Sequence, residues 1–235
     1  MGKFLHAFFS PLGLRRAVPQ VWDGFQTNVK LMVIAEILVL VLALVVAIVR
    51  GLPGRWSLPL RGLAVAYTDF FRGTPLILVA YVIALGLPSL KIAVVSSQSL
   101  FVYGVASLTL VYTAYVTEVY RAGIESVHPS QRMAARSLGL TYAQTLRHVI
   151  LPQAIRRVVP PLLNDFIGLQ KDTAIITVIG LTEAIAQAGF YSNDFFSYAG
   201  YSVAAIFFVI LTIPFARFTD SLIKQRERRE RAQLV

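Results

Sequence analysis

A short polar segment decides the fold: SQRMAARSLGLTYAQTLRHVILP, residues 130–152. Ser130 is a favourable N-cap for a helix that begins at Gln131, and Gly139 can end that helix in the left-handed conformation. Thr141 and Gln144 have the spacing of a capping box, which predicts a second helix that stops near residue 152 because a proline stands there. The segment is too polar to cross a membrane, so we expect a short helix-turn-helix between two apolar stretches.

Apolar stretches on both sides of this segment are long enough to cross a bilayer. A spanning helix needs about 20 mostly apolar residues. The stretches that meet this requirement are residues 28–49, 63–87, 99–120, 158–181 and 198–218. Asp69, Arg72 and Pro75 interrupt the second stretch, which predicts a kink near its start. We therefore expect an all-α membrane protein with five transmembrane helices and its termini on opposite sides.

The composition agrees with a membrane protein. Of the 235 residues, 56% are hydrophobic and 14% are charged, whereas charged residues make up roughly a quarter of a soluble domain. The net charge of +10 comes from Lys and Arg between and after the apolar stretches, which argues against a nucleic-acid-binding stripe. The chain has no cysteine, and its three histidines lack metal-ligand spacing, so we expect no metal site.

The distribution of basic residues predicts the orientation. Residues 50–61, 121–157 and 217–231 are rich in Arg and Lys, whereas the opposite segments offer Lys91 and a few residues near the N-terminus. Loops rich in Lys and Arg stay in the cytoplasm, so the N-terminus is expected outside and the C-terminus inside. The expected division is an extracytoplasmic segment 1–27, a membrane domain 28–220 with its polar loop at about 121–152, and a cytoplasmic basic tail 221–235. A cleaved signal peptide is not expected, because the mixed N-terminus has no long apolar core.

Ionisable side chains within the stretches mark candidate sites, because a charge at membrane depth normally faces a cavity or a partner group. Lys171 and Asp172 are adjacent and cannot share a helix face, so each is expected to find its own partner. Asp172, Thr173 and Asn164 either line the path of a zwitterionic substrate or form a hydrogen-bond network between helices. Glu36 either offsets a cationic group on the substrate or pairs with another span.

The third stretch carries a hydroxyl stripe of Thr109, Thr113, Thr117 and Tyr120 at helical spacing, which is expected to face protein rather than lipid. Glu118 and Arg121, three residues apart, predict an intrahelical ion pair near the inner surface.

At the second stretch, Arg72-Gly73-Thr74-Pro75 places a flexible position beside a rigid one. This break is either a gate or hinge, or plain helix-start chemistry.

Several motifs in one order resemble the importer permeases of the ATP-binding-cassette superfamily. Met133-Ala134-Ala135, Gly139 and VILP at residues 149–152 are similar to the signature loop of that family, normally Glu-Ala-Ala, Gly and Ile-x-Leu-Pro. Other motifs resemble its polar amino acid branch: FRGTP at 71–75, AYVTEVYRAG at 114–123, LPQA at 151–154, PPLLN at 160–164 and KDT at 171–173. The resemblance runs from about Gly24 to the end of the fifth stretch.

The resemblance implies a permease subunit of the type I importer fold in the bacterial inner membrane, which moves polar amino acids into the cytoplasm by alternating access. It implies three kinds of partner: a second permease, identical or related, two ATP-binding subunits, and an extracytoplasmic substrate-binding protein. ATP and Mg would bind to the ATP-binding subunits. The chain itself would not be an enzyme, because its sequence has no Gly-rich phosphate loop ending in Lys-Ser or Lys-Thr.

The resemblance also implies that the first helix of the polar segment is the coupling helix that the ATPases grip. Ala134, Ala135 and Leu138 would form its small apolar face, and Arg132 and Arg136 would help to transmit a rigid-body motion. This chain has Ser130 and Met133 where the family normally has Gly and Glu, so we expect docking to rely on the two arginines. The predicted coupling residues are Ser130, Gln131, Arg132, Met133, Ala134, Ala135, Arg136, Leu138 and Gly139. The predicted pathway residues are Glu36, Arg72, Thr74, Thr113, Thr117, Asn164, Lys171, Asp172 and Thr173.

Three other interpretations stay open from the sequence. The same architecture could import an opine or another small zwitterion, because the binding protein sets much of the selectivity. The charges also select no single amino acid: Glu36, Asp165 and Asp172 favour a cationic substrate, and Lys171 and Arg72 an acidic one. A passive channel would carry flux without ATP. A membrane-embedded enzyme would need its carboxylates to converge on one site, whereas here they are scattered over different stretches.

Overall fold

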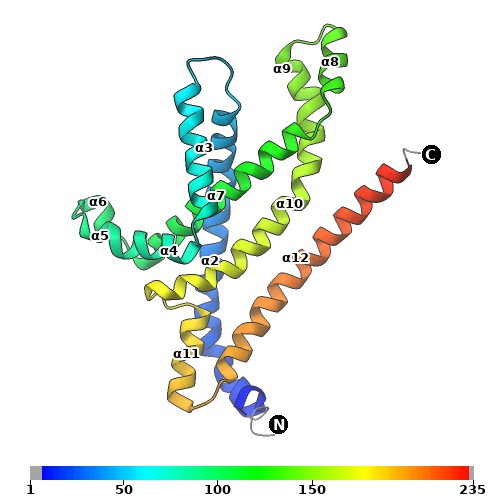
Figure 1. Ribbon diagram of the computed structural model, residues 1–235. Helices are drawn as coiled ribbons and strands as arrows, with labels where there is room; N and C mark the ends of the chain where they lie inside the picture. Colours follow the sequence, from blue (N-terminus) through cyan, green and yellow to red (C-terminus); the bar gives the residue numbers. More distant parts are fainter. Residues whose placement is uncertain (1–6, 233–235) are drawn as a thin grey trace.

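The computed structural model describes residues 7–232 (Figure 1), and within this range every regular element is helical. The all-α prediction is therefore confirmed. The elements are α2 (Pro11–Arg50), α3 (Leu58–Gly73), α4 (Leu76–Tyr81), a π-helical turn (Val82–Gly86), α5 (Leu87–Ser89), α6 (Ala93–Ser96), α7 (Leu100–Glu125), α8 (Pro129–Ser137), α9 (Tyr142–Thr145), a second π-helical turn (Leu146–Ile150), α10 (Leu151–Asp172), the 3₁₀ segment η3 (Thr173–Ile179), α11 (Ala184–Phe195) and α12 (Ala199–Ala232).

Three single helices are long and apolar enough to cross a membrane: α2, α7 and α12. Two bent pairs meet the same requirement together. The first joins Leu58–Gly73 to Leu76–Ser89 at 107°, and the second joins Ala143–Ile179 to Ala184–Phe195 at 54°. If each bent pair counts as one span, the chain has the five predicted spans.

The helix that contains the first predicted span begins before that span. Helix α2 starts at Pro11, where the Ser10 hydroxyl accepts a hydrogen bond from the Gly13 amide at 3.1 Å, and it continues through Pro19. The predicted boundary at residue 27 is therefore not a structural break. Residues 11–27 were not predicted as helical because they mix polar and apolar side chains, and the apolar run starts only at about residue 28.

The second span bends in its middle rather than near its start. Thr74 leaves the helical conformation, with φ −103° and ψ 126°, because the residue before a proline is pushed toward the extended region. The Thr74 hydroxyl donates a hydrogen bond to the Phe70 carbonyl at 2.8 Å, in the last turn of α3. Helix α4 then starts after Pro75 in a new direction.

The second helix of the polar segment does not stop at Pro152, contrary to the prediction. The π-helical turn Leu146–Ile150 leads directly into α10, and Pro152 lies in the first turn of α10. A proline is tolerated there because the amide that it lacks has no obligatory partner in a first turn. The fourth span then ends in η3, and Gly180 with φ +88° separates it from α11, a helix that the sequence did not predict.

Three apolar clusters hold the described helices together, the smallest of which consists of Val127, Ile150 and Ala154. The largest lies between α2, α4, α7, α10 and η3 and includes Leu31, Leu108 and Ile176. The second lies where α2, α11 and α12 meet, around Val21 and Tyr191. Thr109, Thr113 and Thr117 are also buried, which confirms that the hydroxyl stripe of α7 faces protein.

The arrangement separates the two ends of the molecule (Figure 1). Helices α7 and α10 rise together to α8 and α9, which lie at the end opposite the N-terminus. Helix α12 begins near the N-terminal end of the molecule and runs toward the end that holds α8.

Candidate functional site

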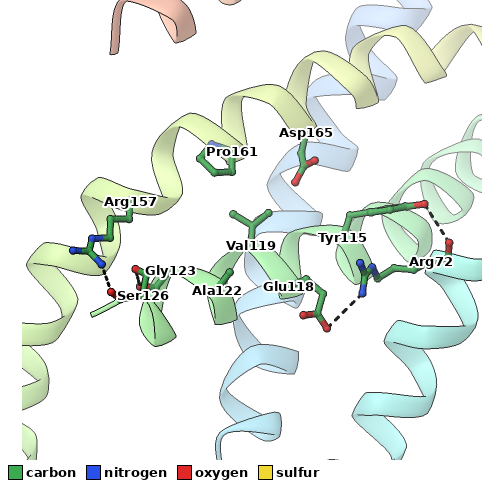
Figure 2. Close-up of a pocket in the computed structure, with 10 residues that line it drawn as sticks. All are labelled: Arg72, Tyr115, Glu118, Val119, Ala122, Gly123, Ser126, Arg157, Pro161 and Asp165. Carbon is green, nitrogen blue, oxygen red and sulfur yellow. Dashed lines mark hydrogen bonds and ion pairs between the residues drawn. The ribbon is translucent and has the colours of Figure 1, made fainter. Parts of the chain in front are cut away.

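A cleft of about 430 Å³ lies between the end of α3, the second half of α7 and α10 (Figure 2). Charges of both signs line it: Arg72 and Arg157 are cationic, and Glu118 and Asp165 are acidic. The other lining residues are Tyr115, Val119, Ala122, Gly123, Ser126 and Pro161.

Glu118 is the most heavily paired acid of this cleft. Its carboxylate accepts hydrogen bonds from Arg121 Nε at 3.0 Å and Nη2 at 2.9 Å, and it forms an ion pair with Arg50. Arg50 also donates to the Thr68 hydroxyl at 3.0 Å. The predicted intrahelical pair of Glu118 and Arg121 is thus confirmed. Arg50 was not predicted as a partner of Glu118, because its place at the end of α2 does not indicate which helix lies beside it.

Arg72 is the most loosely held arginine around Glu118. Its Nη1 lies 3.9 Å from Glu118 Oε1, and its side chain is 45% exposed, against 13% for Arg50. Its backbone carbonyl accepts a hydrogen bond from the Tyr115 hydroxyl at 3.3 Å, which fixes the end of α3 beside α7. The guanidinium therefore keeps most of its donors free on the cleft side (Figure 2).

Asp165 points from α10 toward the cleft (Figure 2). Its Oδ2 is buried and has no hydrogen-bond partner within the described part of the chain. A buried carboxylate oxygen without a partner is costly, and this one can still accept a hydrogen bond. The sequence contained Asp165 as one of several charges, and nothing in its spacing marked it above the others.

A second cavity of about 260 Å³ adjoins the cleft, since Tyr115 and Asp165 line both. It also contains three predicted pathway residues, Thr74, Asn164 and Asp172. The Asp172 carboxylate accepts a hydrogen bond from the Tyr112 hydroxyl at 2.8 Å, so Asp172 has its own partner, as expected. The remaining lining residues are Pro75, Leu76, Val111, Tyr112 and Gly168.

The other predicted pathway residues line neither of these two cavities. Glu36 is half-buried on α2, and Lys171 is exposed. Thr113 and Thr117 are buried between helices, and the Thr117 hydroxyl donates to the Thr113 carbonyl at 2.6 Å. Thr173 is fully buried in a hydrogen-bond network with Asn28. For Thr173 the structure therefore favours the network interpretation over the pathway interpretation.

Helix α8 of the polar segment is capped differently from the prediction. His128 is the N-cap, and its Nδ1 accepts a hydrogen bond from the Ser130 amide at 3.2 Å. The helix begins at Pro129, two residues before the predicted start at Gln131, and proline is well suited to a first turn. Gly139 has φ +83°, as expected for the residue that follows the helix end. The capping box is also confirmed: the Thr141 amide donates to Gln144 Oε1 at 2.9 Å, and the Gln144 amide to Thr141 Oγ1 at 3.3 Å.

The exposed face of α8 is bulkier than predicted. Ala135 is 5% exposed, so it is covered by its own chain and does not share a free face with Ala134 and Leu138. Met133 and Leu138 are 62% and 81% exposed. The surface that α8 presents therefore combines two large apolar side chains with Ala134, and Arg132 and Arg136 are exposed beside them.

The base of α8 is fixed to the walls of the cleft. Arg157 of α10 donates a hydrogen bond to the Ser126 carbonyl at the end of α7. At Gly123 the two helices approach so closely that an added Cβ would lie 2.0 Å from Val158 Cγ1. Both helices also line the cleft, and three residues separate the end of α7 from the start of α8.

Comparisons with known proteins identify the family of the chain. The family model "Binding-protein-dependent transport system inner membrane component" matches residues 43–229. A probable glutamine ABC transporter permease protein of Bacillus subtilis (strain 168) is 37% identical over 207 residues, which cover 88% of this chain and 93% of that protein. A glutamate/aspartate import permease protein of Escherichia coli (strain K12) is 31% identical over 229 residues, 93% of this chain and 92% of that protein.

Solved structures are similar over almost the whole chain. One, described as the crystal structure of an amino acid ABC transporter with histidines, has a TM-score of 0.83 and 32% identity, and covers 92% of this chain and 97% of its own. An inward-facing methionine ABC transporter has a TM-score of 0.66 and 18% identity over 92% of this chain and 99% of its own, which shows the shared fold.

Proposed function

The chain belongs to the family of binding-protein-dependent transport system inner membrane components, and we propose that it is the permease subunit through which a polar amino acid enters the cytoplasm. The observation that carries this proposal is the mixed-charge cleft. A free amino acid offers a carboxylate and an ammonium group. Arg72 has donors available for the carboxylate, and the unpaired oxygen of Asp165 can accept from the ammonium group.

The volumes of the two cavities and their shared lining residues support a continuous substrate pathway rather than one isolated binding pocket. Their volumes are about 430 and 260 Å³, and they share Tyr115 and Asp165, so a ligand could pass from one to the other with modest rearrangement. Ligand pockets for small molecules generally measure roughly 300–1,000 Å³. The similar permeases of B. subtilis and E. coli are named for glutamine and for glutamate and aspartate, which supports a polar amino acid as cargo.

ATP hydrolysis is assigned to separate subunits. In this proposal two ATP-binding subunits, which hold ATP and Mg, dock on Met133, Ala134 and Leu138 of α8 and pull on the cleft walls through α7 and α10. The remaining predicted coupling residues, Ser130 to Arg132, Ala135, Arg136 and Gly139, shape and support this surface. A second permease, identical or related, completes the path.

The orientation follows the same scheme. The extracytoplasmic binding protein delivers substrate at the end where the N-terminus lies, so residues 1–27 are outside. The α8 loop and the basic tail, residues 221–235, are in the cytoplasm, and residues 28–220 form the membrane domain.

The test is uptake of radiolabelled glutamine, glutamate, arginine and histidine into proteoliposomes that contain this subunit with its cognate ATPase and binding protein. The proposal predicts accumulation of one or a few of these amino acids that requires ATP. Equal flux without ATP would identify a channel instead. ATP-dependent uptake of an opine, with none of any amino acid, would keep the architecture and overturn the cargo.

A further inference from the structure

A buried polar network ties α2 to the junction between α10 and α11. Asn28 Nδ2 donates to Glu183 Oε2 at 2.9 Å and to Thr173 Oγ1 at 3.1 Å. In the other direction, the amide of Ala184 donates to Asn28 Oδ1 at 3.0 Å. Asn28, Thr173 and Glu183 are 2%, 0% and 0% exposed, so these bonds form away from solvent.

The network joins three places in the chain that are distant in sequence. Asn28 lies in α2, Thr173 begins η3, and Glu183 is the N-cap of α11, where its Oε1 accepts from the Ala186 amide at 2.9 Å. The backbones also touch: an added Cβ at Gly24 would lie 2.6 Å from the Glu183 carbonyl. Helix α2 therefore contacts the chain at Thr173, before the 54° bend between Ile179 and Ala184, and at Glu183, directly after the bend.

The network also continues to the cavity wall. Thr173, which accepts from Asn28, directly follows Asp172, and the Thr173 hydroxyl donates to the Gln170 carbonyl at 2.7 Å. Asp172 lines the cavity and accepts from the Tyr112 hydroxyl at 2.8 Å. If the start of η3 moved relative to α2, the Asp172 carboxylate would move relative to α7 and the cavity.

We propose that Asn28 and Glu183 are positioning residues for transport, which hold the α10–α11 junction in register with α2 and thereby keep Asp172 in the cavity wall. They touch neither of the two cavities themselves. Satisfied buried networks specify one arrangement, and half-satisfied ones do not. This inference rests on the proposed function, because it assumes that the cavity wall is where the substrate passes.

The hydrogen bond between Asn28 and Glu183 can be tested by exchanging its donor and its acceptor between the two positions. Asn28→Asp places two carboxylates face to face and removes the donor to Thr173. Glu183→Gln in the same chain supplies a new donor toward residue 28, while its carbonyl oxygen can still accept from Ala186. Asn28→Asp with Glu183→Gln therefore exchanges donor and acceptor between positions 28 and 183 at constant formal charge, and the Thr173 hydroxyl can turn from the Gln170 carbonyl to donate to the new carboxylate.

The experiment measures the KM and the maximal rate of ATP-dependent uptake in proteoliposomes with the full transporter complex, for the amino acid that the wild-type complex carries. Asn28→Asp is expected to raise KM about tenfold or more, the order expected when a buried charge-assisted hydrogen bond is lost. The double variant is expected to return KM to within about threefold of wild type. The matched control is Asn193→Asp, the same change at an exposed position of α11, which is expected to leave KM unchanged.

Wild-type KM in Asn28→Asp would overturn the inference and leave the proposed function intact, whereas absence of wild-type uptake would contradict the proposed function itself. A fall in maximal rate at constant KM, in proportion to the amount of folded protein, would show a structural role only and would also overturn the inference. If Asn28→Asp does not accumulate in membranes, Glu183→Gln alone decides: its KM must rise, and the second change must restore it.

Discussion

Arg72 and Glu118 differ in how fully the protein uses their charges. Glu118 already accepts from Arg50 and Arg121, whereas Arg72 stands 3.9 Å away with an exposed guanidinium. Removal of Arg72 should therefore cost the ion network little and should cost a bound carboxylate much. Such asymmetry distinguishes a binding residue from a structural one.

Arg72→Gln is predicted to raise the KM for amino acid uptake about tenfold, corresponding to roughly 1.4 kcal/mol. Arg72→Lys should recover part of this loss, because an ammonium group keeps the charge but not the forked geometry. The matched control is Arg55→Gln, the same change at an exposed arginine between α2 and α3. Equal KM values for Arg72→Gln and Arg55→Gln would exclude Arg72 from substrate binding.

Asp165→Asn tests the opposite side of the cleft. The amide removes the negative charge that would face the ammonium group, so we predict a higher KM together with unchanged or higher thermal stability, because a buried unpaired carboxylate oxygen is lost. Asp194→Asn on the exposed surface of α11 is the control. A marked drop in melting temperature for Asp165→Asn would instead indicate a structural partner for this acid.

At the scale of elements, α7 and α10 approach each other closely, and we propose that motion of α8 reaches the cleft through this contact. Gly123→Ala would place a Cβ 2.0 Å from Val158 Cγ1, so the two helices must separate or the valine must change rotamer. The predicted loss of stability is about 1–3 kcal/mol, measured by thermal unfolding of the purified complex in detergent. The control Gly62→Ala in α3 meets nothing within 4 Å and should stabilise by up to about 1 kcal/mol. Equal effects at both positions would contradict the close approach.

Helix α8 is predicted to couple ATP hydrolysis to the cleft through its exposed face. Arg136→Glu reverses an exposed charge beside Met133 and Leu138 and should reduce substrate-stimulated ATP hydrolysis severalfold, while the abundance of the permease in membranes stays constant. The matched control is Arg55→Glu. Unchanged stimulation in the Arg136 variant would count against the view that the arginines replace the missing signature glutamate in docking.

For the whole molecule, the pattern of apolar stretches predicted the helical class and the number of spans, because a bilayer imposes its thickness on every span. Local chemistry was also readable: Gly139 and the Thr141–Gln144 box form as expected. The cap at His128 was missed because proline at the next position moved the helix start by two residues.

Contacts between segments that are distant in the sequence could not be predicted from the sequence pattern. Asn28 and Glu183 are 155 positions apart, and neither carries a local signal that names the other. The sequence around Arg50 and around Asp165 likewise does not indicate which distant residues lie beside them. Asn164 and Asp172 were predicted as pathway residues from their polarity at membrane depth, and Thr74 from its place in the break before Pro75. All three line one cavity.

The central claim is that the two adjoining cavities are the path of the substrate and that ATP changes their access. The chain has no cysteine, so Asn164→Cys gives a single thiol at an exposed position that lines the smaller cavity. The measurement is its rate of modification by a water-soluble thiol reagent in the assembled complex, with and without amino acid and ATP. We predict that the transported amino acid protects the thiol and that ATP changes the rate of modification severalfold. One constant rate under all conditions, with transport intact, would contradict it.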